Sequence, residues 1–238
     1  MKKKIYITFD MDWACDDVLE VFYSYICEWG IKATINVTHE THMLDVFRKD
    51  EKIELGIHPN FNNLLNGSVV SGINASDVIA KIKGIVPDAV TMRAHSLVKS
   101  TPLTSLLAEN GIKYELNSYV IPQRGMVLQP YMFEKVWQIP FIFEDDLYMQ
   151  AHMQIKPEEY LSQEFDVSRV FNFHPIHLFL NCEKLERYHL AKIYYHDFGK
   201  LKQFVNKGNE NGMYNYFCSL IECAYRKGYV FETIKEIE

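Results

Sequence analysis

Short apolar runs and amphipathic segments alternate along the chain. The runs have the length of strands and no helical period, whereas the longer segments repeat apolar residues every three or four positions. Strands are predicted at 5–9, 33–37, 53–57, 89–94, 112–116, 169–173 and 229–234. Helices are predicted at 16–30, 42–49, 76–84, 101–110, 157–163 and 213–226. Because strand and helix alternate, the pattern predicts a parallel sheet covered by helices.

Two segments break this alternation. Residues 59–74 hold five asparagines and two glycines and are predicted to form a long loop, with Asn74 or Ser76 capping the next helix. Residues 119–149 are rich in proline and aromatic residues. The short runs at 126–128 and 136–143 in this second segment indicate a hairpin or an irregular insertion.

Length and charge restrict the class of protein. A chain of 238 residues with 48% hydrophobic content suits one large core better than two small ones. A single domain spanning residues 1–238 is therefore predicted, of a size that suits a β/α barrel. The formal net charge is −6 and no basic stripe is present, so nucleic acid is not an expected partner. The sequence does not fix the oligomeric state.

Several features bear on location. The five cysteines form an odd set without CxxC spacing, which favours a reducing compartment over a disulfide framework or a thiolate zinc site. The basic start Met1 to Lys4 precedes an apolar run that Asp10 soon interrupts, so no secretory signal is predicted. No apolar stretch approaches the roughly 20 residues of a membrane-spanning helix. The expectation is a soluble cytoplasmic protein.

Ionisable residues follow several of the predicted strands. In β/α barrels the catalytic groups lie at the carboxyl ends of the strands, so these positions are the candidate site. They are Asp10, Asp12 and Trp13 after the first strand, His58 and Asn62 after the third, Arg93 and His95 after the fourth, and His174 and His177 after the late strand.

Asp10 and Asp12 form the first candidate pair. They alternate along an extended chain, so both side chains are expected on the same side of the strand. Two adjacent carboxylates repel each other, and a bound metal ion relieves that repulsion. His58 would add an imidazole, and this combination suits zinc or a similar divalent ion. The alternatives are that Asp12 caps the following helix and that His58 is structural.

The remaining candidates are Arg93, His95, His174 and His177. Arg93 at the end of a buried strand requires a partner, for which a carboxylate at the barrel mouth is the natural choice. His174 could protonate a leaving group at neutral pH, whereas the HxxH pattern that His177 completes is a weak metal signature. His95 could bind substrate, support the metal site or simply satisfy the core.

Three motifs together resemble a known family. The segment TFDMDW at 8–13, KAT at 32–34 and ELGIH at 54–58 are similar to motifs of the polysaccharide deacetylases of carbohydrate esterase family 4, the NodB-homology group. The order of Arg93 and His174 supports the match. The resemblance implies a distorted, incomplete (β/α) barrel. It also implies a metal-dependent hydrolase that removes an acetyl or other small acyl group from an N-acylated sugar.

The resemblance also implies residue roles. Asp10 becomes the catalytic base fixed by Arg93, His174 the general acid, and Asp12 and His58 metal ligands, with zinc as the expected ion and cobalt, nickel or iron as alternatives. The acidic motif that orients the late histidine is represented by Asp145 or Asp146. Substrate contacts are expected from Trp13, His95, Asp146 and His177.

One position departs from the family pattern. The family has a second metal histidine four residues after the first, and this chain has Asn62 there. An amide oxygen is a weaker ligand for zinc than imidazole. Either Asn62 serves as the third ligand, or a group such as His95 or His177 replaces it, or metal binding is lost.

Three functions follow from these alternatives. The first is deacetylation of an N-acetylated sugar in a cytoplasmic precursor of a surface polysaccharide, carried by a nucleotide or a lipid. The second is deformylation or hydrolysis of a small amide at the same centre. The third is a catalytically inactive carbohydrate-binding protein that keeps the scaffold.

Overall fold

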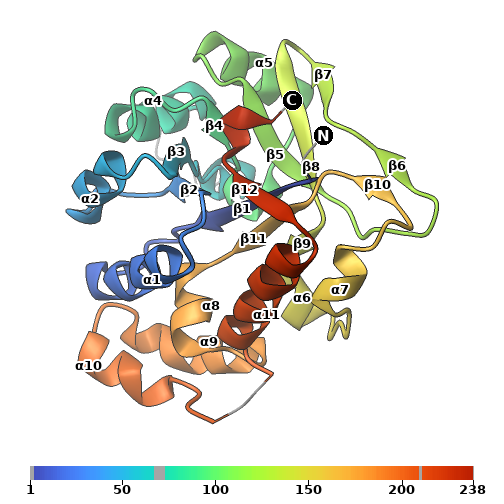
Figure 1. The fold of residues 1–238 in the computed structure, drawn as a ribbon. Coiled ribbons are helices and arrows are strands. Elements are labelled where there is room, and N and C mark those ends of the chain that lie inside the picture. The colour runs from blue at the N-terminus through green and yellow to red at the C-terminus, as the bar shows by residue number, and fades with distance from the viewer. Residues whose placement is uncertain (1–2, 67–72, 209–210, 238) are drawn as a thin grey trace.

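The chain winds a curved parallel sheet and covers it with helices. The computed structural model describes residues 3–66, 73–208 and 211–237 (Figure 1). The parallel strands of its central sheet are β1 (Lys3–Asp10), β2 (Ala33–Val37), β3 (Ile53–Ile57), β4 (Thr91–Met92), β5 (Tyr114–Tyr119), β8 (Val136–Phe141), β9 (Phe143–Glu144), β11 (Val170–Phe173) and β12 (Tyr229–Glu232). The alternation predicted from the sequence therefore produces the predicted parallel sheet.

Strand pairing brings the sheet round upon itself. β1 pairs with β2, and the order continues through β3, β4 and β5 to β8. Ile142 links β8 to β9, and β9 pairs with β11, which in turn pairs with the second half of β1. The first half of β1 pairs instead with β12. This circuit is the distorted (β/α) barrel expected from the sequence.

The helices bury the apolar stripes that identified them. They are α1 (Asp16–Trp29), α2 (Met43–Lys49), α4 (Ala75–Ile85), α5 (Thr101–Glu109), α7 (Pro157–Tyr160) and α11 (Met213–Arg226). α1 buries Val18, Leu19, Phe22 and Ile26 and ends at Gly30, whose φ of 63° only glycine adopts freely. α4 begins at Asn74, which settles the choice of cap, through a capping box with Asp77. No helix in the described ranges is long and apolar enough to cross a membrane.

The segment predicted as an irregular insertion is the main correction to the fold. Its residues 136–144 are barrel strands β8 and β9, which pair with β5 and β11. β8 is buried at every position except Trp137, and strands buried on both faces do not alternate polar and apolar residues. Part of the prediction is confirmed, because β7 (Tyr131–Phe133) forms an antiparallel pair with β8. β6 (Val127–Leu128) pairs with β10 (Asp166–Val167), not with its neighbour in sequence.

Several other strand boundaries differ from the predicted ones by a few residues. The fourth strand is shorter than predicted and the fifth ends three residues later, at Tyr119. The long loop after β3 contains a helical turn, α3 (Asn62–Leu65), and its residues 67–72 lie outside the described part of the chain. Five short elements that were not predicted lie between β11 and α11 in the described residues: α8 (Pro175–Leu180), α9 (Leu185–Ala191), η2 (Lys192–Tyr194), α10 (Phe198–Leu201) and η3 (Lys202–Phe204).

The barrel interior carries a small apolar cluster beneath a polar mouth. Tyr6 belongs to this cluster with Leu116, Phe141 and Val170 from neighbouring strands. Thr8 and Asp10 follow Tyr6 on the same face of β1, because side chains alternate along a strand. The interior therefore changes from apolar to ionisable toward the carboxyl end of β1, where the candidate site lies.

Candidate active site

Asp10 ends β1 and is buried among hydrogen-bond donors. Its Oδ1 accepts hydrogen bonds from Asn36 Nδ2 at 2.8 Å and from Arg93 Nη1 at 3.2 Å, and its Oδ2 accepts one from Asn172 Nδ2 at 2.8 Å. Burial raises the pKa of Asp10, but the charges of Arg93 and of two nearby histidines outweigh it and hold the pKa below its ordinary value. Asp10 is therefore ionised and fixed in orientation.

Arg93 is the fully buried cation that holds this end of the barrel together. Besides Asp10, its Nη1 donates to Thr8 Oγ1 at 2.9 Å and to Asn172 Oδ1 at 2.5 Å, and its guanidinium lies 4.4 Å from the ring centre of Phe141. The partner expected for this arginine, a carboxylate at the mouth, is thus Asp10. A buried charge of this kind is tolerated because it is paired and hydrogen-bonded.

Gly56 makes room for the network. A side chain at this position of β3 would overlap Oδ1 of Asn36 and crowd the backbone of Thr91. Asn36 could then not hold its place beside Asp10. The glycine of the ELGIH motif is therefore explained by close packing between β3 and its neighbours.

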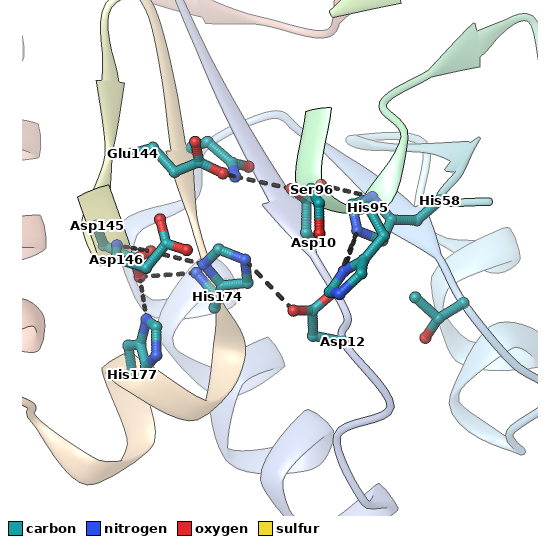
Figure 2. A network of polar contacts seen from close by, with 12 residues as sticks. Asp10, Asp12, His58, His95, Ser96, Glu144, Asp145, Asp146, His174 and His177 are labelled. Carbon is teal, nitrogen blue, oxygen red and sulfur yellow. Dashed lines mark hydrogen bonds and ion pairs between the residues drawn. The ribbon is translucent and has the colours of Figure 1, made fainter. Parts of the chain in front are cut away.

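Asp12 reaches the site by a turn and not by strand alternation. β1 ends at Asp10, and both Asp12 and Trp13 have positive φ, 42° and 57°. The expected extended path is therefore wrong, although both carboxylates still face the mouth (Figure 2). Tyr195 fixes the turn by donating its hydroxyl proton to the Asp12 carbonyl at 2.7 Å. The capping alternative is also wrong, because Cys15 is the N-cap of α1 and no side chain caps it.

Two histidine side chains meet at Asp12. Its Oδ1 lies 3.2 Å from His58 Nε2 and 3.2 Å from His95 Nδ1, and the two ring nitrogens are 3.3 Å apart (Figure 2). Burial would raise the pKa of Asp12, but its contacts with both histidines hold the pKa well below the ordinary value. The hydrogen bond to Asp12 raises the pKa of His95. The three residues come from the ends of β1, β3 and β4.

This triangle fits a divalent metal ion. In a tetrahedral zinc site with bonds of about 2.0–2.1 Å, neighbouring ligand atoms lie about 3.3 Å apart. Such a site also requires the second nitrogen of a ligating histidine to donate to an acceptor. His58 Nδ1 is buried without a hydrogen-bond partner among the described residues, and Asp10 Oδ1 lies 3.5 Å from it. One carboxylate, two imidazoles and an adjacent acceptor make a donor set that suits zinc.

Asn62 has no contact with Asp12, His58 or His95 among the interactions of the described residues. It begins α3, and its Nδ2 donates to Ser96 Oγ at 3.0 Å. Of the residues that the sequence left open as the third ligand, the structure places His95 next to Asp12 and His58. Trp13 stands at the rim with 36% of its surface exposed, and its ring meets that of His95 edge to face at 5.2 Å.

His174 and Asp145 form a second pair of ionisable side chains in the site. His174 Nδ1 lies 2.6 Å from Asp145 Oδ1, and its backbone N–H donates to Asp145 Oδ2 at 2.8 Å. Burial would lower the pKa of His174, but Asp145, with Asp12 and Asp146, raises it well above the ordinary value. His174 Nε2 faces Asp12 Oδ2 at 3.6 Å. Of the two aspartates considered for the acidic motif, Asp145 makes the contact.

His177 shares the same carboxylate. Pro175 opens α8 directly after His174, so His177 lies one turn further and its Nδ1 comes within 3.1 Å of Asp145 Oδ2. His177 has no contact with Asp12 or His58 among the interactions described. In Figure 2 it lies below Asp145 and to the lower left of His174, on the side away from Asp12, His58 and His95.

Several residues of the site were not predicted. Asn36, Asn172 and Glu144 are buried polar residues on strands whose neighbours are apolar. The signal was present, since a polar residue in the middle of an apolar strand must find a partner inside the fold. A cavity of about 400 Å³ beside His58, with Trp13, Thr38, Asn60 and Asn63 in its lining, was also not foreseen.

The comparisons with known proteins agree with this geometry. The profile of the family described as WbmS-like polysaccharide deacetylase matches residues 7–192. The chain belongs to this family. It is therefore a carbohydrate deacetylase of the hydrolase class, and the resemblance inferred from the three motifs is confirmed. No curated protein matches the sequence.

Solved structures share the fold of this deacetylase. A protein of Bordetella bronchiseptica, described as a candidate polysaccharide deacetylase involved in O-antigen biosynthesis (WbmS), is 31% identical. The match covers 93% of this chain and 90% of that one, with a TM-score of 0.83. The family 4 carbohydrate esterase of Streptomyces lividans is 8% identical, with a TM-score of 0.54 over 98% of this chain and 93% of that one. The second likeness shows the fold alone.

Proposed function

We propose that this deacetylase removes the acetyl group from an N-acetylated sugar in a precursor of a surface polysaccharide, with one divalent ion held by Asp12, His58 and His95. The observation that carries the proposal is the triangle of donor atoms beside an ionised Asp10 and a protonated His174. When bound, the ion polarises the acyl carbonyl and makes water a better nucleophile.

Asp10 is the proposed base. Its Oδ1 already accepts from Asn36 and Arg93, whereas its Oδ2 accepts only from Asn172 among the described residues. Each carboxylate oxygen has two acceptor positions, so Oδ2 retains one for the proton of the attacking water. Arg93 keeps the carboxylate ionised and the two asparagines keep it from rotating.

His174 is the proposed acid. Its Nδ1 is engaged by Asp145, so the proton available to the substrate is on Nε2, which faces Asp12. Transfer of that proton to the departing sugar nitrogen lets the amine leave as a neutral group. Asp145 holds the ring in orientation and stabilises its protonated form, as the carboxylate does in other acid–base pairs of this kind.

The cavity beside His58 supports a sugar substrate. Its volume of about 400 Å³ is in the range of small-molecule sites, and Trp13 offers an aromatic face for a sugar ring. Asn60 and Asn63 bring amide groups that can hydrogen-bond hydroxyls. The 31% identical WbmS relative, described as involved in O-antigen biosynthesis, motivates a surface-polysaccharide precursor as the substrate class. A cytoplasmic location stays a prediction that cell fractionation can check.

A panel of substrates tests the proposal. Chelator-treated enzyme is incubated with N-acetylated sugars carried by a nucleotide or a lipid, with formamido sugars and with cyclic amides, each with and without zinc. The proposal expects zinc-dependent acetate release from an N-acetylated sugar. Faster hydrolysis of formamides or cyclic amides would support the deformylase alternative. Glycan binding without hydrolysis of any of these compounds would support the inactive binding protein.

Replacing His95 with alanine is expected to weaken zinc binding by more than about 100-fold, the upper range for loss of a residue that only supports a ligand. Asn62→Ala is the matched comparison and is expected to bind zinc nearly as the wild type does, because its side chain contacts Ser96. Competition with a chromophoric chelator measures both affinities. The opposite ranking would assign the third ligand to Asn62.

Replacing Asp145 with asparagine is expected to move the basic limb of the pH profile to lower pH. Asp145 raises the pKa of His174, and a general acid loses activity as the pH rises through its pKa. Without the carboxylate, His174 loses its proton at lower pH. The profile of kcat/KM for acetate release measures the shift, and Asp146→Asn is expected to cause a smaller one. An unmoved limb in Asp145→Asn would remove His174 from the role of acid.

A further inference from the structure

Glu144 is a buried carboxyl for which the proposed mechanism has no use. It ends β9 and lies opposite Asn172 of β11 in the strand register. Only 6% of its surface is exposed. Its Oε1 accepts a hydrogen bond from Asn172 Nδ2 at 3.3 Å, whereas its Oε2 is buried and has no partner among the described residues. A buried polar atom without a partner requires an explanation.

The orientation of Asn172 determines how Glu144 is bonded. Asn172 Oδ1 accepts from Arg93 Nη1 at 2.5 Å and from Thr8 Oγ1 at 2.9 Å. Its amide nitrogen must therefore face the carboxyls, where it donates to Asp10 Oδ2 at 2.8 Å and to Glu144 Oε1. Since Oε1 serves as an acceptor, a proton on this carboxyl is located on Oε2.

Glu144 lies close to both the proposed base and the proposed acid. One oxygen of Glu144, one of Asp10 and one nitrogen of His174 all lie within 4.8 Å of one another. In Figure 2, Glu144 lies above and to the left of His174, whereas Asp12 and His95 lie to the right of His174. A substrate placed for attack between Asp10 and His174 therefore comes close to the Glu144 carboxyl group.

We propose that Glu144 contacts the substrate and that its Oε2 donates a hydrogen bond to an oxygen of the acylated sugar. This inference rests on the proposed function. The acceptor is the acyl carbonyl or a hydroxyl next to the acylamino group, because only these oxygens lie near the reacting bond. Glu144 would thus select substrates that carry an acceptor at this position, since a buried donor left unpaired weakens binding.

The surroundings of Glu144 favour its protonated form. Asp146 on the short helix α6 (Asp145–Gln150) and Asp10 on β1 bring negative charge near it, whereas His174 and Arg93 bring positive charge. Burial, together with Asp146, raises the pKa of Glu144 to about 8. The carboxyl is therefore mostly neutral at pH 7 and can act as a donor.

Steady-state kinetics of Glu144→Ala and Glu144→Gln test this contact. The alanine variant is expected to raise KM for the N-acetylated sugar by about 2- to 10-fold at pH 7, the effect of one lost neutral hydrogen bond. The glutamine variant keeps an N–H donor at this position, so its KM is expected to rise less. Glu51→Ala, which removes an exposed carboxyl before β3, is the control.

The pH dependence of KM adds a readout that a purely structural role would not change. In the wild type, KM is expected to rise above about pH 8 as Glu144 loses its proton. In Glu144→Gln this rise is expected to be absent. If circular dichroism shows that Glu144→Ala does not fold, the pH dependence of KM in the wild type and in Glu144→Gln is sufficient to test the contact.

Three results would overturn the contact. The first is a wild-type KM in Glu144→Ala. The second is a KM in Glu144→Gln as high as that of Glu144→Ala, and the third is a KM in Glu144→Gln that still rises above pH 8 as in the wild type. Failure of the proposed function is distinguishable, because wild-type enzyme would then release no acetate in the same assay.

Discussion

Replacing Asp12 with alanine is expected to remove the bound ion and to lower kcat/KM for acetate release by roughly a thousandfold or more. A catalytic divalent ion supplies several kcal/mol of transition-state stabilisation, and each 1.4 kcal/mol corresponds to about a tenfold change in rate. Asp12 is the carboxylate at which His58 and His95 meet, so its loss leaves two imidazoles without the negatively charged ligand. Metal content by mass spectrometry and acetate release measure the two effects.

Asp88→Ala is the matched control for Asp12→Ala, because Asp88 is an exposed aspartate in the turn before β4. It is expected to keep one ion per chain and the wild-type rate. An Asp12→Ala protein that retained one ion per chain would contradict the account, since the ion would then be bound elsewhere. Loss of activity without loss of the ion would make Asp12 a substrate ligand.

Replacing Asp10 with asparagine is expected to lower kcat by about 10²- to 10⁴-fold while the ion stays bound. General base catalysis contributes an effect of this size, and an amide cannot take up the proton of water at neutral pH. The substitution keeps the size of the side chain, so Arg93 and both asparagines retain a neighbour of similar shape. Rates of acetate release and metal content are measured on the same preparation.

The metal content of Asp10→Asn distinguishes a base from a supporting residue. Asp10 Oδ1 lies 3.5 Å from His58 Nδ1, so Asp10 could instead act by orienting this ligand. In that case the variant would lose the ion, and adding excess zinc would restore the rate. The account expects no such rescue, because the missing function is proton transfer.

The sequence predicted the candidate site at the level of strand ends. Asp10, Asp12, His58, Arg93, His95 and His174 all follow β-strands, and parallel strands bring their carboxyl ends to one edge. The pairing of Arg93 with a carboxylate also followed from the sequence, because a buried guanidinium requires one. These inferences depend on local pattern and on topology, which the alternation of strands and helices fixes.

The third residue of the proposed metal site, after Asp12 and His58, could not be predicted in the same way. The family pattern places it four residues after His58, on the same loop, where this chain has Asn62. His95 instead comes from the end of β4, 37 positions further along the chain. Whether two loops meet depends on their paths in space, and neither the length nor the composition of a loop determines that path.

The sequence also did not identify the buried polar residues of the site. Asn172 was placed in an apolar strand, whereas Glu144 lay in the segment predicted to be irregular, and their shared hydrogen bond depends on the register between β11 and β9. β9 itself lay in a segment whose prolines and aromatic residues concealed a barrel strand. Register between strands distant in sequence is a tertiary property, so the single sequence identifies such residues only as polar groups that need a partner.

Anomalous diffraction at the zinc absorption edge, from crystals of the zinc-loaded protein, tests the central claim most directly. The account predicts one anomalous peak within bonding distance of Asp12, His58 and His95. Asn62 is expected to lie outside bonding distance, and Asp10 is expected to lie beside the ion without binding it. No peak at this position, or a peak bonded to Asn62 in place of His95, would contradict it.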